Sequence, residues 1–207
     1  MVIGRFSSLM LSRFQAYVEG FFASSAAAFH AAGLSPNKIT FLGFVFVFGS
    51  ALLYAIGLPQ LSYWAAAGLL LLSAGYFDVI DGAMARRYKD VSKVGGVFDS
   101  VLDRLGEIFL YAGFALGGLA SYPVAIWALS ASLMVSYVRA RVEVEGVTLK
   151  GIGIAERPER LLIVLVATIA FPAYHESISW GTLLVAVLST VTVVERIYQA
   201  WKILSTR

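Results

Sequence analysis

The sequence predicts an all-α integral membrane protein with six transmembrane helices, preceded by an N-terminal amphipathic helix in the membrane interface. Three observations predict this fold class. Of the 207 residues, 59% are hydrophobic and only 14% are charged, whereas a soluble domain has roughly 45–50% apolar and 25% charged residues. Uncharged runs recur along the chain and exceed the roughly 9–11 residues of a membrane barrel strand. The 16 Lys and Arg residues fall only in the two terminal segments and in alternate connections between those runs, or next to them, which places all 16 on one side of the expected bundle.

The first expected element covers residues 7–31. Apolar residues that include Leu9, Phe14, Val18 and Phe22 recur there at roughly helical spacing. This pattern is typical of a helix that lies in the membrane interface. A helix packed against the transmembrane bundle explains it equally well. The segment lacks the apolar core and small-residue cleavage site of a signal peptide.

The six spans follow from the lengths of the apolar runs. A transmembrane helix needs roughly 17–25 apolar residues. The tract 105–138 carries a single charge, at Glu107, and is too long for one span. Gly117-Gly118 and Ser121-Tyr122-Pro123 supply a turn inside it. We expect helices at 36–57, 62–86, 94–118, 122–145, 156–173 and 177–203. One bundle uses the whole chain, so residues 1–207 are expected to form a single domain.

Charge placement predicts the orientation in the membrane. The connections at 57–62, 117–123 and 171–178 contain no Lys or Arg. Since these residues concentrate in cytoplasmic loops, we expect a multi-pass protein of the cell (plasma) membrane with both termini cytoplasmic. The one-sided charge suits anionic lipids and anionic substrates better than nucleic acid. The chain has no Cys, which excludes disulfides and thiol catalysis.

Four aspartates flank one short loop on the cytoplasmic side. Asp78 and Asp81 end the second expected span, and Asp99 and Asp103 begin the third. Residues three or four apart share one face of a helix. Four ionised carboxylates brought together at the membrane need a compensating cation, and all-oxygen ligation suits Mg²⁺, Mn²⁺ or Ca²⁺. Pairing with nearby Arg and Lys in a solvated loop is the alternative, and the four spacings together favour the metal site.

The spacing of this segment resembles the signature of the CDP-alcohol phosphotransferases. That signature reads Asp, two residues, Asp-Gly, two residues, Ala-Arg, eight residues, Gly, three residues, Asp, three residues, Asp. Its fixed positions here are Asp78, Asp81, Gly82, Ala85, Arg86, Gly95, Asp99 and Asp103. The resemblance implies six transmembrane helices, a cytoplasmic active site and a homodimer. It also implies a reaction in which an acceptor hydroxyl attacks the β-phosphorus of a CDP-linked lipid and CMP leaves.

The resemblance further implies a role for each motif residue. Metal, either Mg²⁺ or Mn²⁺ and expected as two ions, would be bound by Asp78, Asp81, Asp99 and Asp103. The general base would be Asp103. CDP would be bound by Asp78, Asp81, Gly82, Ala85, Arg86 and Asp99, with Asn37 and Thr40 facing the nucleotide. A simple helix start at Ser35-Pro36 explains the last segment equally well. A metal pair and a carboxylate base suit phosphoryl-type transfer, and neither His30 nor His175 is near the motif.

Basic residues in the second half of the chain suggest the acceptor. Arg139, Arg157 and, less specifically, Arg196 resemble the positions that bind the phosphate of inositol 1-phosphate in the branch of that family that makes phosphatidylinositol phosphate or archaetidylinositol phosphate. Arg139 replaces the Lys usual in the bacterial members, which keeps the charge but changes the hydrogen-bonding geometry. Other basic residues are interpreted as surface charges near lipid headgroups: Arg141, Arg160 and Lys202.

Several alternatives stay open at this point. The donor is either CDP-diacylglycerol or CDP-archaeol, and glycerol 3-phosphate or another alcohol is an alternative acceptor. A metal-ion transporter is a more distant alternative. Transport would favour charged residues near the membrane midplane on several helices, whereas these aspartates cluster at one face of the membrane.

Overall fold

The computed structural model describes residues 20–57, 60–149 and 151–205, and within these ranges the chain is helical with no strand. The elements agree with the expected ranges to within three residues: α2 (Pro36–Ala55), α3 (Leu61–Tyr88), α4 (Lys93–Leu116), α5 (Tyr122–Val144), α6 (Arg157–Ala170) and α7 (Ser177–Leu204). The prediction of an all-α protein is confirmed.

Local sequence signals set the ends of these helices. Helices α2, α5 and α6 each carry a proline in the first turn, where the missing N–H costs no intrahelical hydrogen bond. Helix α4 is capped by Ser92, whose hydroxyl accepts a hydrogen bond from the Gly95 N–H at 2.9 Å. Helix α3 ends at Tyr88, and the capping residue Lys89 adopts the left-handed conformation with φ 55°. These ends fix the short α3–α4 loop between the two aspartate pairs.

Four of the helices in the described part of the chain are long and apolar enough to cross a membrane: α2, α3, α5 and α7. Helix α4 has 24 residues but begins with the charged motif, and α6 has only 14 residues. At 1.5 Å per residue, α6 is roughly 21 Å long, which is shorter than the roughly 30 Å hydrocarbon core. The chain is therefore a helical membrane protein.

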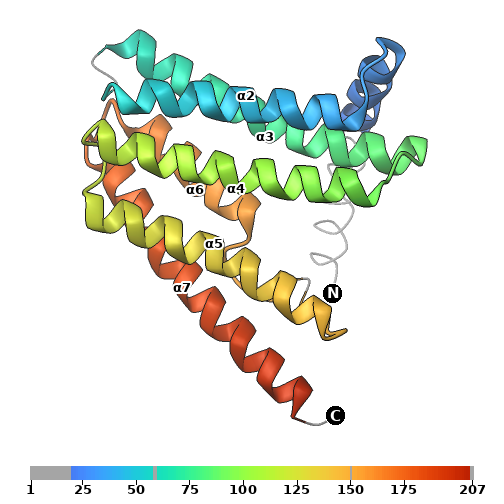
Figure 1. The fold of residues 1–207 in the computed structure, drawn as a ribbon. Coiled ribbons are helices and arrows are strands. Elements are labelled where there is room, and N and C mark those ends of the chain that lie inside the picture. The colour runs from blue at the N-terminus through green and yellow to red at the C-terminus, as the bar shows by residue number, and fades with distance from the viewer. Residues whose placement is uncertain (1–19, 58–59, 150, 206–207) are drawn as a thin grey trace, which may run out of the picture.

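The helices pack as neighbours in an elongated bundle (Figure 1). Helix α2 packs along α3 and α4, α5 packs along α7, and α6 packs against α7 and α3. The three connections without Lys or Arg, which join α2 to α3, α4 to α5 and α6 to α7, lie at one end of this bundle. The motif loop between α3 and α4 lies at the opposite end.

Two glycines at the end of α4, one in its last turn and one directly after it, permit close contact with α2. A Cβ atom on Gly113 would lie 2.5 Å from the Ala51 carbonyl oxygen, and one on Gly117 would overlap the Tyr54 carbonyl oxygen. These glycines therefore serve helix packing inside one chain, as small residues commonly do in membrane bundles.

The described part of the N-terminal segment, residues 20–31, is helical and packs on the end of α3. The Phe22 ring lies 5.9 Å from that of Tyr76, and the His30 ring stacks at 3.6 Å on Tyr88. Ala26 is fully buried. These contacts support packing against the bundle for this part, whereas residues 7–19 of the expected interfacial helix lie outside the described residues.

Candidate active site

Three of the four motif aspartates converge between α3 and α4. One carboxylate oxygen each from Asp78, Asp99 and Asp103 lies within 4.8 Å of the others. Asp81 is turned toward α2, where its Oδ2 accepts a hydrogen bond from Thr40 Oγ1 at 2.6 Å. The Asp99 Oδ1 is buried without a hydrogen-bond partner in the described structure. A buried carboxylate oxygen without a donor and two further carboxylates beside it fit a hard divalent cation.

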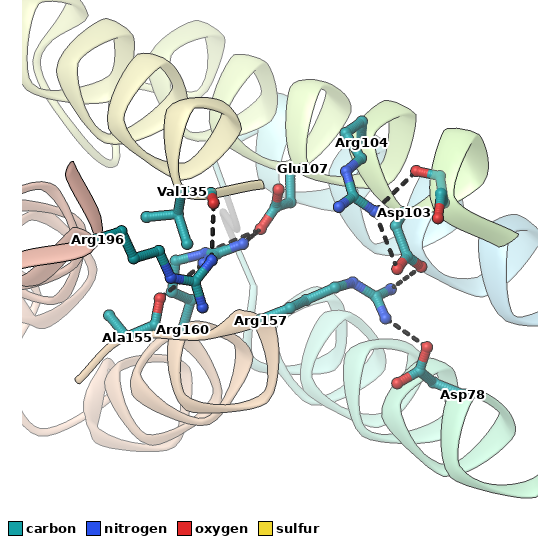
Figure 2. Close-up of polar contacts among 10 residues, drawn as sticks. Asp78, Asp103, Arg104, Glu107, Val135, Ala155, Arg157, Arg160 and Arg196 are labelled. Atoms are coloured by element: carbon teal, nitrogen blue, oxygen red, sulfur yellow. Dashed lines mark hydrogen bonds and ion pairs between the residues drawn. The ribbon is translucent and has the colours of Figure 1, made fainter. Parts of the chain in front are cut away.

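Arg157, the first residue of α6, lies between the two aspartate helices. Its guanidinium donates to Asp78 Oδ1, and its Nη2 lies 2.9 Å from Asp103 Oδ1 (Figure 2). A second arginine, Arg104, lies 3.5 Å from the Asp103 carboxylate. Arg157 thus offsets carboxylate charge from both α3 and α4. Arg157 is not part of the aspartate motif, so the positive charge that compensates these carboxylates comes from a distant segment of the chain.

A cavity of about 140 Å³ lies between the starts of α2 and α4 and the end of α3. It is lined by six of the eight residues predicted to bind CDP: Asn37, Thr40, Asp81, Gly82, Ala85 and Asp99. Neither Asp78 nor Arg86 lines this cavity, although Asp78 and Asp81 together line a neighbouring one. A Cβ atom on Gly95 would lie 2.9 Å from the Asn37 side-chain oxygen. The absence of a side chain at Gly95 therefore leaves room for Asn37 in the cavity wall.

A second cavity, of about 380 Å³, is lined by five arginines from four segments of the chain: Arg104, Arg139, Arg157, Arg160 and Arg196. The three arginines predicted to bind the acceptor phosphate are therefore brought together. Asp103 also lines this cavity, and Asp99 lines both this cavity and the smaller one. The two cavities consequently meet at the carboxylate cluster.

The three predicted arginines differ in their existing contacts. Arg139 is partly exposed and pairs with Glu143 one turn along α5, at 2.9 Å. Arg196 is buried and donates to the Ile152 and Val135 carbonyls at 2.8 and 2.7 Å, and to the Glu156 carboxylate at 2.6 Å. Arg196 thus connects α7 to α5 and to the segment before α6, while Arg139 lines the cavity from a partly exposed position on α5.

The interpretation of Arg160 as a surface charge was wrong. Its side chain is 2% exposed and pairs with Glu107, which is 4% exposed, through a 2.9 Å contact from Nε to Oε1. The signal was the single carboxylate in a long apolar tract, because a buried charge at membrane depth requires a counter-charge. Arg141 does lie at the surface, paired with Glu145 at 2.5 Å, and Lys202 is also exposed.

An apolar groove of about 550 Å³ runs between α3 and α6 and reaches the carboxylate cluster at Asp78. Its walls are mainly aliphatic, with Leu71 and Leu72 on α3 facing Leu161, Leu162 and Leu165 on α6. A charged site therefore opens directly onto a surface suited to hydrocarbon chains.

Two polar cavities that meet at a carboxylate cluster, beside an apolar groove, form the arrangement expected of a membrane enzyme that acts on charged lipid headgroups. Sequence comparison specifies the family. Residues 33–193 match the CDP-alcohol phosphatidyltransferases, and the chain belongs to this family.

Named relatives include two inositol phosphate lipid synthases. The archaetidylinositol phosphate synthase of Pyrococcus horikoshii is 38% identical over 170 residues, which cover 82% of this chain and 85% of that protein. The phosphatidylinositol phosphate synthase of Mycobacterium tuberculosis is 32% identical over 180 residues, covering 82% and 80% of the two chains.

Crystal structures of the Mycobacterium tuberculosis enzyme are similar in fold. The structure with CDP-DAG bound has a TM-score of 0.75 and 29% identity, over 87% of this chain and 93% of that chain. The structure in complex with manganese and citrate has a TM-score of 0.74 and 30% identity, over 87% and 88% of the two chains.

Proposed function

We propose that this protein transfers the phosphatidyl or archaetidyl group from a CDP-linked lipid to inositol 1-phosphate and releases CMP. The observation that carries the proposal is the meeting of two polar cavities at one carboxylate cluster, with arginines concentrated in only one of them. A nucleotide and a separate phosphorylated acceptor can then reach the same reaction centre. The names of its relatives in archaea and mycobacteria support the inositol phosphate acceptor.

The donor is assigned to the smaller cavity and the groove. The nucleotide lies against Asn37, Thr40 and Gly82, and the lipid chains lie in the groove between α3 and α6. The donor diphosphate then falls beside Asp78 and Asp99. Arg86 lies outside this cavity, so its predicted contact with CDP is the least supported of the nucleotide assignments.

The metal assignment rests on the chemistry of the aspartates. Asp78, Asp99 and Asp103 hold a divalent cation, Mg²⁺ or Mn²⁺, with Asp81 completing the predicted set of ligands. When bound, such a cation neutralises the charge of the diphosphate and makes CMP a better leaving group. The relative crystallised with manganese supports this assignment.

The reaction follows from the position of Asp103 in the arginine-lined cavity. Arg139, Arg157 and Arg196 bind the acceptor phosphate through charge-assisted hydrogen bonds. The Asp103 carboxylate takes the proton from the acceptor hydroxyl. The new bond joins the acceptor oxygen to the β-phosphorus, and the bond from that phosphorus to the bridging oxygen breaks. CMP leaves with the bridging oxygen.

The membrane arrangement is part of the proposal. We infer six spans, with α4 and α6 completing the bundle, and a homodimer in the plasma membrane. Both termini and the active site face the cytoplasm, because Lys and Arg are absent from the three connections at the opposite end of the bundle.

A screen of acceptors tests the proposed function. Purified protein with CDP-lipid and Mg²⁺ or Mn²⁺ is given inositol 1-phosphate, glycerol 3-phosphate, inositol or serine, and CMP release is measured. CMP release that depends on inositol 1-phosphate supports the proposal. Turnover with inositol or serine and none with inositol 1-phosphate contradicts the assignment of the acceptor.

A further inference from the structure

A buried ion pair lies one helical turn deeper in the bundle than the active site. Glu107 on α4 and Arg160 on α6 are both nearly inaccessible, and they are the only ion pair in the described ranges with both side chains buried. Burying two charges costs more desolvation energy than most such pairs recover, so a buried pair is weak evidence for stability. A role in specifying one arrangement of the helices is the other use of such a pair.

The sequence spacing couples this pair to the catalytic residues. Asp99, Asp103 and Glu107 follow one another at intervals of four residues along α4, so they share one face. Arg157 and Arg160 are three apart on α6 and share the face opposite. Asp103 pairs with Arg157, and Glu107 pairs with Arg160 one turn below (Figure 2). Two ion pairs, one helical turn apart, therefore join α4 and α6.

The Glu107–Arg160 pair also contacts the segment just before α6. The Arg160 Nη1 donates to the Ala155 carbonyl oxygen at 2.8 Å, two residues before Arg157. Arg160 Nε and Nη2 both donate to the Glu107 carboxylate. Glu107 is absent from the lining of the arginine cavity, so it has no direct contact with a ligand there.

We propose that Glu107 and Arg160 are positioning residues that set the register of α6 against α4, so that Arg157 reaches Asp103 and the acceptor phosphate. This inference rests on the proposed function, because Arg157 is taken as a ligand of the acceptor. A change at Glu107 should act on acceptor binding indirectly, through Arg157, whereas any direct contact of Arg160, which also lines the cavity, is tested by Arg160→Lys. It should leave the nucleotide cavity unchanged, because α2, α3 and α4 form that cavity without α6.

The test is a double-mutant cycle with Glu107→Asp and Arg157→Gln. Glu107→Asp keeps the charge but shortens the side chain by one methylene group. In the wild-type background it should raise the KM for inositol 1-phosphate about tenfold, with the KM for CDP-lipid unchanged. In the Arg157→Gln background the same change should alter the acceptor KM by less than about twofold, because residues that act through one another are not additive.

A second variant separates positioning from stability. Glu107→Leu combined with Arg160→Met replaces the pair with apolar side chains, which often keeps or raises stability. We expect a thermal midpoint no lower than that of the wild type but a raised acceptor KM. The matched control, Glu145→Leu with Arg141→Met, removes the exposed pair on α5 and should leave both KM values unchanged.

The outcomes that overturn the inference are distinct from those that overturn the function. Wild-type KM values in Glu107→Asp, or equal effects in both backgrounds, contradict the positioning role. A raised KM in Arg160→Lys with none in Glu107→Asp assigns Arg160 a direct contact instead. If the wild type uses a different alcohol, the proposed function fails, and the same cycle measured with that alcohol still decides the role of Glu107.

Discussion

The Arg157 guanidinium on α6 lies 2.9 Å from the Asp103 carboxylate on α4, within a cavity that both residues line. The predicted ligand of the acceptor phosphate is therefore in direct contact with the predicted general base. In the proposed reaction, an acceptor phosphate bound to Arg157 would bring its hydroxyl-bearing ring next to Asp103, as base catalysis requires.

The first prediction concerns the general base. Asp103→Asn should lower kcat by at least about a hundredfold while the protein stays folded, because an amide of similar shape cannot accept the proton. Steady-state CMP release and a thermal midpoint measure the two effects. Glu159→Gln, an exposed change in the first turn of α6, is the control. Near-normal turnover in Asp103→Asn across pH would show that another group is the base.

The second prediction concerns the metal. A chelator should abolish CMP release, and added Mg²⁺ or Mn²⁺ should restore it. Asp78→Asn and Asp81→Asn should raise the metal concentration needed for half-maximal activity, because an amide oxygen is a weaker ligand for a hard cation than a carboxylate. Titration of activity with Mn²⁺ measures this shift. Wild-type metal dependence in both variants would remove these residues from the metal site.

The third prediction concerns the acceptor phosphate. Replacing Arg139 or Arg157 with Gln should chiefly raise the KM for inositol 1-phosphate. A charge-assisted hydrogen bond is worth about 1.5–3 kcal/mol, or roughly tenfold to more than a hundredfold in affinity. Arg196→Gln should also lower the thermal midpoint, because it loses bonds to two backbone carbonyls. Arg141→Gln and Lys202→Gln are the controls. Equal, modest effects at all five positions would contradict a defined pocket.

The fourth prediction concerns the contact between α2 and α4. Gly113→Ala should destabilise the protein by about 1–3 kcal/mol, because the added Cβ meets the Ala51 carbonyl oxygen and the helices must separate. Gly75→Ala on α3 is the matched control, since a Cβ there meets no atom within 4 Å. Thermal unfolding in detergent compares the two. Equal midpoints would show that α4 does not pack this closely on α2.

The fifth prediction concerns orientation. The chain has no Cys, so single cysteines can be introduced without background labelling. Gln60→Cys, Ser121→Cys and Glu176→Cys should react with an impermeant thiol reagent added to intact cells. Arg141→Cys should react only after the membrane is permeabilised. Labelling in the reverse pattern would place the active site outside.

Much of the fold was predictable because membrane helices have simple signals. Apolar length and the turn residues near Gly117 and Pro123 gave the helix boundaries to within three residues. The common direction of Asp99 and Asp103 was also predictable, since residues four apart share one face of a helix. Asp81 is three residues after Asp78 but is turned toward Thr40 on α2, and helical spacing alone did not indicate this.

The remaining features depend on contacts between distant segments. Arg160 and its neighbour Arg157 have the same side chain, yet one is buried against Glu107 and the other lies at the aspartates. Only the position of α6, which packs against α3 and α7 and reaches α4 through these side chains, distinguishes them. Likewise, no local sequence pattern indicates that Arg196 donates hydrogen bonds to the Ile152 and Val135 carbonyls.

The most direct test of the central claim follows one phosphorus atom. CDP-lipid labelled in the phosphate next to the lipid is incubated with the purified protein, the divalent metal and inositol 1-phosphate, and the products are separated. The account predicts that the label moves into a lipid that now carries inositol phosphate, and that the released CMP is unlabelled. Label in a released nucleotide, or no labelled lipid that depends on inositol 1-phosphate, would contradict it.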